Sequence, residues 1–265
     1  MSNYVLCYTR KPVDSVLYDP RLAYSMHLAL SSDGVHYRGL NHNSGVLFSL
    51  ATENEDGSLN PMSLKNPFLF SMKDGTFGVL AIRIEADGDR DESSKGSVLF
   101  WTSEDLLVYQ EVGLIQLSDC YIERVTCCYH ESGDCYQISW LDETGRTFCG
   151  ELDMLQSGKG SVTAKEVSTL MALPELGEVG GARRNDMIEV SPVVAERLQK
   201  KLITPENTGV IFPDEISVCS EEELADYCAT LTYSDGTTVQ RKVNWDLSAV
   251  DFNKEGDYNI QGKVQ

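Results

Sequence analysis

The chain has 265 residues, of which 41 are Asp or Glu and 22 are Lys or Arg, so its formal charge at neutral pH is −19. A surface this acidic repels phosphate backbones and anionic lipid head groups, which excludes nucleic acids and membrane surfaces as expected partners. Hydrophobic residues make up 42% of the chain, enough for one large core or two ordinary ones, and no apolar run is long enough to cross a bilayer.

The start of the chain and its cysteines bear on its location. The first residues contain no charged segment followed by an apolar one, so no secretory signal is predicted and the sequence as written is expected in the cytoplasm. If the sequence is part of a longer protein, secretion or a cell-surface location is the alternative. The eight cysteines are expected to be reduced thiols, with a disulfide such as Cys219 to Cys228 as the alternative. Cys127 and Cys128 are adjacent, which places them on opposite faces of a strand.

Alternation of apolar and polar residues predicts a series of short strands over about the first 165 residues. Turns rich in Asp and Gly separate them, as at Asp33-Gly34 and Lys73-Asp74-Gly75. The predicted strands cover residues 4–8, 24–30, 46–50, 68–72, 77–84, 97–101, 111–117, 122–129, 135–141 and 146–152. This part of the chain is therefore expected to be an all-β meander.

The predicted strands also repeat. Residues 27–37 resemble residues 99–109, with Asp33 matching Asp105 and Tyr37 matching Tyr109. A second pair, 68–80 and 128–139, repeats a strand, a hairpin with Gly and Asp, and another strand. Repeats of several tens of residues in an all-β chain are typical of propeller blades, although duplicated hairpins in a sandwich would give a similar pattern.

One helix is predicted over residues 191–202, because Ser191 can cap its start and Pro192 suits the first helical position. Strands are predicted again over residues 211–218, 227–233, 237–245 and 257–264. The expected organisation is a propeller-like domain over residues 1–190, a helix and linker over 191–209, and a separate β-rich domain over 210–265. Both β-rich parts are acidic, so no basic groove is expected.

The C-terminal block carries the patterns Tyr233-x-Asp235-Gly236-Thr237, Val243-x-Trp245-Asp246 and Gly256-x-Tyr258-x-x-x-Gly262. In these it closely resembles a bacterial Ig-like module. The resemblance implies a small β-sandwich whose core contains Trp245 and Tyr258. Modules of this kind usually act as spacers or stabilisers beside extracellular or carbohydrate-active enzymes.

The N-terminal block resembles the five-bladed β-propeller of family 43 glycoside hydrolases in residues 24–37, 64–75, 98–106 and 181–190. That family releases arabinose or xylose units from plant polysaccharides, so the resemblance implies a neutral plant oligo- or polysaccharide as the partner. The expected fold is all-β: a partial or degenerate five-bladed type of propeller followed by an Ig-like sandwich. The predicted strands fill only two to three blades, so a catalytic domain or subunit that completes the propeller is a further expected partner.

The catalytic residues of that family have no clear match here. The family inverts the sugar with an aspartate base and a glutamate acid. Where the family reads Arg-Asp-Pro-Phe, this chain reads Lys65-Asn66-Pro67-Phe68, and an amide takes no proton at neutral pH. The acid position falls at Thr126, and Glu123 can replace it only if a bulge intervenes, because residues three apart point to opposite faces of a strand.

The candidate site residues follow from these departures. Asp19 and Glu123 are the candidate base and acid, with a simple turn as the alternative role for Asp19. Asn66, Trp101 and Arg184 are the candidate substrate-binding residues, with core packing as the alternative for Trp101. We expect a non-catalytic accessory region of a family 43 type of protein; the alternative is an active arabinofuranosidase or xylosidase.

No cofactor is expected. The acidic run 87–92 has the composition of a calcium loop, but Val98 stands where an EF-hand loop has its final glutamate. A solvated acidic loop is therefore expected, with a structural calcium ion as the alternative. The four histidines, His27, His36, His42 and His130, are expected at surface or packing positions, because no Ser or Cys motif accompanies them.

Overall fold

Strands provide most of the regular structure in the computed structural model, which describes residues 2–10, 12, 19–152, 164–167 and 183–264. The chain divides into two units, Met1–Ile203 and Thr204–Gln265. Within the described residues, no helix has the length and apolar character needed to cross a membrane. The prediction of an all-β fold is confirmed.

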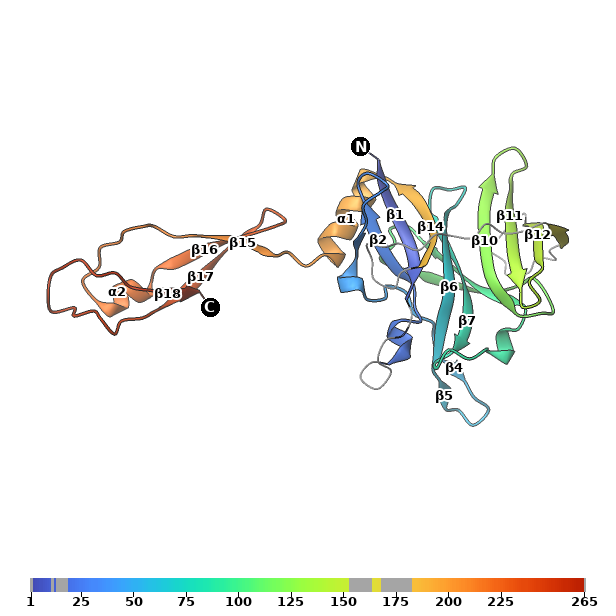
Figure 1. The fold of residues 1–265 in the computed structure, drawn as a ribbon, viewed down its shortest axis with the longest axis horizontal. Helices are drawn as coiled ribbons and strands as arrows, with labels where there is room; N and C mark the ends of the chain where they lie inside the picture. Colours follow the sequence, from blue (N-terminus) through green and yellow to red (C-terminus); the bar gives the residue numbers. More distant parts are fainter. Residues whose placement is uncertain (1, 11, 13–18, 153–163, 168–182, 265) are drawn as a thin grey trace. The chain divides into compact units, whose positions relative to one another are not determined.

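Three four-stranded antiparallel sheets form the first unit (Figure 1). In the order of their pairing, the first sheet contains β14 (Arg183–Val190), β1 (Asn3–Thr9), β2 (His27–Ser31) and β3 (Arg38–Gly39). The second contains β6 (Met62–Ser71), β7 (Phe77–Glu85), β8 (Ser97–Ser103) and β9 (Gln110–Gln116). The third contains β10 (Ile122–His130), β11 (Cys135–Asp142), β12 (Thr147–Leu152) and β13 (Lys165–Val167).

Short elements connect these sheets. The hairpin of β4 (Thr52–Glu53) and β5 (Leu59–Asn60) precedes β6, and single 3₁₀ turns form at η1 (Pro20–Leu22), η2 (Asn41–Asn43) and η3 (Glu92–Ser94). The three sheets agree with the two to three blades expected from the repeats, and they form a partial, propeller-like arc. The sheets contact one another at their edge strands. Strand β6 of the second sheet contacts β14 of the first sheet and β10 of the third.

Apolar side chains fill the two spaces between neighbouring sheets. Between the first and second sheets, Leu28, Leu64 and Trp101 are at most 2% exposed. Between the second and third, Phe100 and Trp140 are at most 1% exposed. Burying each such side chain contributes about 1.5–3 kcal/mol relative to leaving it in water. The second sheet is therefore covered on both faces, which makes it the central layer of the unit.

The internal repeat corresponds to one loop that joins the third and fourth strands of the first two sheets. In the first copy, Asp33 Oδ1 accepts hydrogen bonds of 2.8 Å from the backbone N–H groups two and three residues ahead. Ser31 Oγ accepts from the N–H of Gly34 at 2.9 Å, and Tyr37 donates to the carbonyl of Gly34 at 3.1 Å. Gly34 has a φ of 75°, which glycine adopts at little cost.

The second copy makes the same bonds. Asp105 Oδ1 accepts from the N–H groups two and three residues ahead at 3.0 and 3.1 Å, and Ser103 Oγ accepts from the N–H of Leu106 at 2.8 Å. Tyr109 donates to the carbonyl of Leu106 at 2.8 Å. Leu106 takes the left-handed conformation of Gly34, with a φ of 61°. The repeat seen in the sequence is therefore a repeat of blade structure.

Helix α1 (Pro192–Leu202) forms where it was predicted, and Ser191 Oγ accepts from the N–H of Val194 at 3.3 Å. Its buried residues Ala195 and Leu198 pack into the core between the first and second sheets. Arg197 also pairs with Asp105 at 3.6 Å. The helix therefore belongs to the first unit, rather than to a linker over residues 191–209 as the sequence suggested.

The second unit contains one four-stranded sheet of β15 (Asn207–Ile211), β16 (Cys228–Tyr233), β17 (Thr238–Trp245) and β18 (Gly262–Val264), with the short helix α2 (Glu221–Ala225). It begins before residue 210, because Asn207 already pairs with Tyr233. Trp245 packs edge-on against Phe212, with ring centroids 5.2 Å apart. Tyr258, expected in the core, is 37% exposed and donates to two backbone carbonyls. A second sheet, as in a full sandwich, does not form among the described residues of this unit.

The repeated loop gives a first prediction. Replacing Asp105 by Ala leaves two backbone N–H groups without their acceptor and removes the pair with Arg197, so we expect the free energy of unfolding to fall by about 1–3 kcal/mol. Urea denaturation followed by circular dichroism measures this. The control is Glu104→Ala, an exposed neighbour, which should change stability by less than about 0.5 kcal/mol. Equal stability of the two variants would contradict the role given to Asp105.

Candidate functional site

A bulge in β6 places Asn66 at the contact between the sheets. The pairing of β6 with β7 is irregular between Lys65 and Phe68. Pro67 has no N–H to give to a strand ladder, and Asn66 has a φ of 49°, a left-handed conformation that Asn tolerates better than most residues. The sequence Asn-Pro therefore produces the bulge.

Both neighbouring sheets form hydrogen bonds with this bulge. Asn66 Nδ2 donates to the backbone carbonyl of Glu123 on β10 at 2.7 Å. Cys7 Sγ, on β1, donates to the carbonyl of Pro67 at 3.3 Å. We name this contact region, formed by Asn66, Pro67, Cys7 and Glu123, the hub. It joins all three sheets through polar contacts.

Glu123 lies at a second bulge, in β10, where the pairing with β11 shifts between Ile122 and Arg124. Its Oε2 pairs with Lys65 Nζ at 3.2 Å and its Oε1 pairs with Arg90 Nη2 at 3.0 Å. Both carboxylate oxygens of Glu123 are thus held by cations.

Arg90 extends this network. Its Nη1 pairs with Glu143 Oε2 at 2.6 Å, and its guanidinium lies 4.6 Å from the centre of the Tyr121 ring. Glu143 Oε1 in turn accepts from the N–H of Tyr121 at 3.3 Å. The chain of pairs from Lys65 through Glu123 and Arg90 to Glu143 connects the second and third sheets.

A small pocket lies beside the network, with Lys65, Arg90, Tyr121 and Glu123 in its lining. Its volume is about 30 Å³. That is the space of about one water molecule, whereas sites for organic ligands usually measure hundreds of cubic ångströms. The pocket does not accommodate a sugar ring in this conformation.

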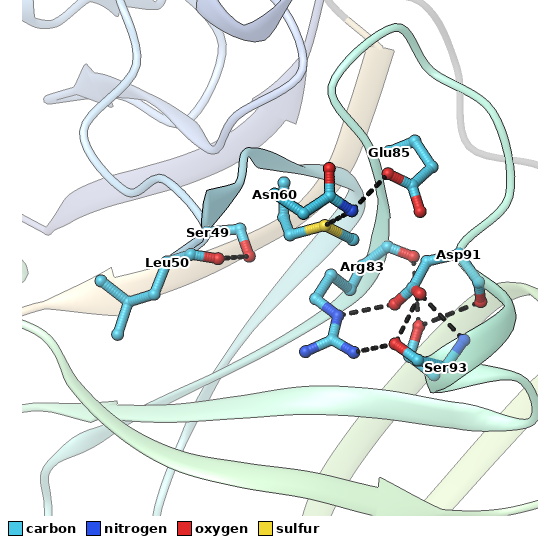
Figure 2. Close-up of polar contacts among 9 residues, drawn as sticks. Ser49, Leu50, Asn60, Arg83, Glu85, Asp91 and Ser93 are labelled. Atoms are coloured by element: carbon cyan, nitrogen blue, oxygen red, sulfur yellow. Dashed lines mark hydrogen bonds and ion pairs between the residues drawn. The ribbon is translucent and has the colours of Figure 1, made fainter. Parts of the chain in front are cut away.

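Figure 2 shows the polar contacts next to this pocket. Arg83 Nε pairs with Asp91 Oδ2 at 2.7 Å, and Arg83 Nη2 donates to Ser93 Oγ at 2.8 Å. Burial alone would raise the pKa of Asp91, but hydrogen bonds from Ser93, Ser94 and Arg83 outweigh it and lower that pKa. Above these residues in the view, Asn60 Nδ2 donates to Glu85 Oε2 at 3.0 Å and ties β5 to β7.

These contacts bear on the candidate calcium loop. Asp91, the buried acid of the run 87–92, is paired with an arginine. Among the described residues, no three His, Cys, Asp or Glu side chains come together in a way that could hold a metal ion. The charge of Asp91 is therefore balanced by Arg83.

The remaining candidates lie elsewhere. Asp19 caps η1, and Arg21 holds it through its backbone N–H and its Nε, each at 2.9 Å. The side-chain hydrogen bond from Arg21 lowers the pKa of Asp19.

Trp101 is 2% exposed within the core, so its ring is used in packing and has no face open to a sugar. Arg184 lies on β14 opposite Tyr8, and its side chain is outside the described residues.

Among the predicted residues whose side chains the structure describes, it brings together Asn66 and Glu123. The hydrogen bonds and ion pairs of Asp19 and Glu123 share no residue. Lys65, Arg90 and Glu143 were missed as members of the site. Lys65 stands next to Asn66 in the resembling motif, and Arg90 is the one cation in the acidic run 87–92, so both left a signal in the sequence.

Comparison with known proteins identifies part of the chain. Residues 229–265 match the family model of the bacterial Ig-like domain, group 4. The C-terminal unit carries a bacterial Ig-like domain. The match agrees with the resemblance seen in the sequence and covers the strands from β16 onward. No curated protein sequence matches the chain significantly.

Solved structures of family 43 glycoside hydrolases are similar to the chain. A β-1,3-galactosidase shares 9% identity at a TM-score of 0.45, covering 92% of this chain and 54% of its own. An exo-β-1,3-galactanase from Phanerochaete chrysosporium shares 11% identity at a TM-score of 0.39, covering 89% of this chain and 46% of its own. A β-1,3-galactosidase with galactodeoxynojirimycin shares 8% identity at a TM-score of 0.41, covering 94% of this chain and 89% of its own. The chain spans about half the length of the first two. Because identities and TM-scores are low, the roles of residues here rest on their own contacts.

The hub gives a second prediction. Replacing Asn66 by Asp removes the donor to the Glu123 carbonyl and adds a negative charge beside it, so we expect a loss of about 1–3 kcal/mol in the free energy of unfolding near neutral pH. Urea denaturation measures it. Asn54→Asp makes the same chemical change on the exposed β4–β5 hairpin and should cost less than about 0.5 kcal/mol. If the free energy of unfolding falls equally in both variants, the hydrogen bond from Asn66 to the Glu123 carbonyl is not important for stability.

Asp91 gives a third prediction, on pH. Because its pKa is lower in the folded than in the unfolded chain, its contribution is fully present above the unfolded value of about 4 and is lost as the pH falls through the folded value. Asp91→Asn should therefore be less stable than wild type near neutral pH, and the difference should shrink below about pH 4. Denaturation curves over a pH series test this, with the exposed Asp119→Asn as the control. If the difference in stability between Asp91→Asn and wild type does not change with pH, the stabilising role given to ionised Asp91 is refuted.

Proposed function

We propose that the chain is a carbohydrate-binding accessory region of a glycoside hydrolase type of protein and that it does not hydrolyse glycosidic bonds itself. The observation that carries this proposal is the state of Glu123, whose two carboxylate oxygens are both paired with cations. The partial propeller, its resemblance to family 43 motifs and the attached Ig-like domain support the association with carbohydrate.

The chemistry of inversion explains why this arrangement favours an accessory role. Inverting hydrolysis needs a protonated carboxyl at the leaving oxygen and a carboxylate that activates water on the other side of the sugar ring. At the hub, Lys65 and Arg90 are paired with the two carboxylate oxygens of Glu123, so both oxygens are engaged in contacts between the second and third sheets. Asn66 stands where the family motif has an aspartate, and its amide donates to a backbone carbonyl.

The other carboxylates around the hub do not supply the missing base. Glu143 is paired with the same arginine as Glu123, and Asp91 is paired with Arg83. The pocket beside them has space for about one water molecule. A nucleophilic water would fit there, but the sugar that it must attack would not.

The carbohydrate we propose is a neutral plant polysaccharide of the arabinan or xylan type. The sequence resemblance suggests this class, and the charge of −19 favours a neutral ligand over an anionic one. The similar solved structures include β-1,3-galactosidases and an exo-β-1,3-galactanase, so β-1,3-galactan belongs in the same test as a third ligand.

The experiment measures binding and turnover side by side and forms a fourth prediction. Affinity electrophoresis of the full chain in gels with arabinan, xylan or β-1,3-galactan should show retardation by at least one of them, and none in a dextran gel. Incubation with the matching oligosaccharides and aryl glycosides should release no sugar. Glu123→Gln and the exposed control Glu131→Gln should both leave the retardation unchanged.

Two outcomes would overturn the proposal. Sugar release that is lost in Glu123→Gln but kept in Glu131→Gln would show that the chain is a glycosidase with Glu123 as a working carboxyl. No retardation by any of the three polysaccharides, from protein shown to be folded by circular dichroism, would remove the proposed carbohydrate-binding role.

A further inference from the structure

The two adjacent cysteines of β10 lie in opposite environments. Cys127 is 3% exposed and packs with Val125 and Trp140 in the core between the second and third sheets. Cys128 is exposed on the other face of the same strand. Burial raises the pKa of the Cys127 thiol strongly, which keeps it protonated and unreactive. The prediction that the pair straddles the strand is confirmed, and it separates one structural thiol from one accessible thiol.

Cys128 belongs to a cluster with His130 and Gln137. His130 lies two residues further along β10, so its side chain is on the same face, and its Nε2 is 3.3 Å from Cys128 Sγ. Gln137 is the cross-strand partner of Cys128 on β11, and its Oε1 is 3.2 Å from the same Nε2. One imidazole nitrogen therefore contacts both the sulfur and the amide oxygen.

The amide fixes the role of the imidazole. Oε1 of Gln137 can only accept a hydrogen bond, so Nε2 of His130 must carry the proton. Nε2–H is then a donor to Cys128 Sγ as well. A donor facing a sulfur atom stabilises the thiolate more than the thiol, because the negatively charged sulfur is the stronger acceptor. The thiol can also donate to the backbone carbonyl of Gln137 at 3.9 Å, but the contact with Nε2 is shorter, so the cluster favours the reactive form of Cys128.

We propose that Cys128 is a site of thiol–disulfide exchange with small, soluble disulfides. The Cys128 thiolate attacks one sulfur of the disulfide R–S–S–R, a new bond forms between Sγ and that sulfur, and the old S–S bond breaks. The other half leaves as the thiolate RS⁻, which is the reduced product, while Cys128 is oxidised to a mixed disulfide. The proton lost from the thiol goes to solvent.

The surrounding charges allow such a reagent to approach. Arg124 lies on β10 an even number of residues from Cys128, and Glu151 is the partner of Gln137 on β12. Lys165 on β13 lies on the same face, because its partner Cys149 is opposite Ser139. Within the part of this sheet that the structure describes, two cations and one anion therefore share this face with His130. Cys219 is also exposed and offers an internal comparison. Among the described residues, no imidazole contacts its sulfur.

The expected size of the effect follows from general thiol chemistry and gives the fifth prediction. A donor at the sulfur raises the fraction of thiolate at about pH 7 more than it lowers the nucleophilicity of that thiolate, because the Brønsted coefficient of thiols is about 0.4–0.5. We expect a net gain on the order of two- to threefold at about pH 7. Above about pH 10, the Cys128 thiol is ionised both with and without His130, so only its lower nucleophilicity beside His130 remains. Cys128 should then react about threefold more slowly with His130 present than without it.

The test uses the full chain with Cys219→Ser, alone and combined with His130→Gln. Dithiodipyridine, a neutral disulfide, is added, and the modified peptide is identified by mass spectrometry. With His130 present, Cys128 should react about two- to threefold faster at about pH 7 and about threefold more slowly above about pH 10. His130→Lys, which places an ammonium donor beside the sulfur, should restore the faster reaction at about pH 7. Glutathione disulfide should give the same order of reactivity.

A merely exposed cysteine would behave differently. Equal rates with and without His130 at both pH values would overturn the proposal, as would a faster reaction in the variant at about pH 7. The unmodified chain supplies a measurement that needs no variant of the cluster: Cys128 must react faster than Cys219 at about pH 7. If Cys219 reacts first, the proposal fails regardless of how the variants fold.

Discussion

The bulge at Asn66 and Pro67 is the constraint on which the first unit depends. An extended strand would present its edge to only one neighbour, but the left-handed turn of Asn66 directs its amide to the backbone of Glu123 and leaves the carbonyl of Pro67 to Cys7. Each bond crosses to a different sheet. Sheets that meet only through apolar packing can slide on one another at little cost, whereas directional bonds at a shared strand fix their relative position.

The same bulge determines what the site can do chemically. Because the amide of Asn66 is used as a donor, an aspartate there would lose the bond between sheets. Likewise, Lys65 and Arg90 reach Glu123 from the second sheet, so the carboxylate that the sequence offered as a candidate acid holds the second and third sheets together. A residue that fixes the sheets in place cannot also release and take up a proton in every turnover without weakening those contacts. Structure and chemistry therefore compete for these positions, and here the contacts favour structure.

Features that depend on local contacts could be predicted from the sequence, and features that depend on distant ones could not. The repeat at Asp33 and Asp105 was visible because its hydrogen bonds join residues within a few positions of one another. Helix α1 was visible for the same reason. The partners of Glu123 come from positions 65 and 90, and the bulge that places Glu123 is created by its pairing with β11. Trp101 could be assigned to the core only once the facing sheet was known, since an aromatic residue on a strand suits either a core or a sugar-binding surface.

The outer face of the third sheet, on the side away from the second sheet, bears on whether another sheet completes the arc. Sheets pack against one another through apolar faces, as the first three do on either side of β6 and β7. The outer face of the third sheet instead carries Thr126, Cys128 and His130 on β10, with Ser139 and Gln137 opposite them on β11. Small polar and titratable side chains of this kind suit water or a polar ligand, and burying them under a further blade would cost their hydration. The partner that completes the propeller, expected from the sequence, therefore stays a prediction.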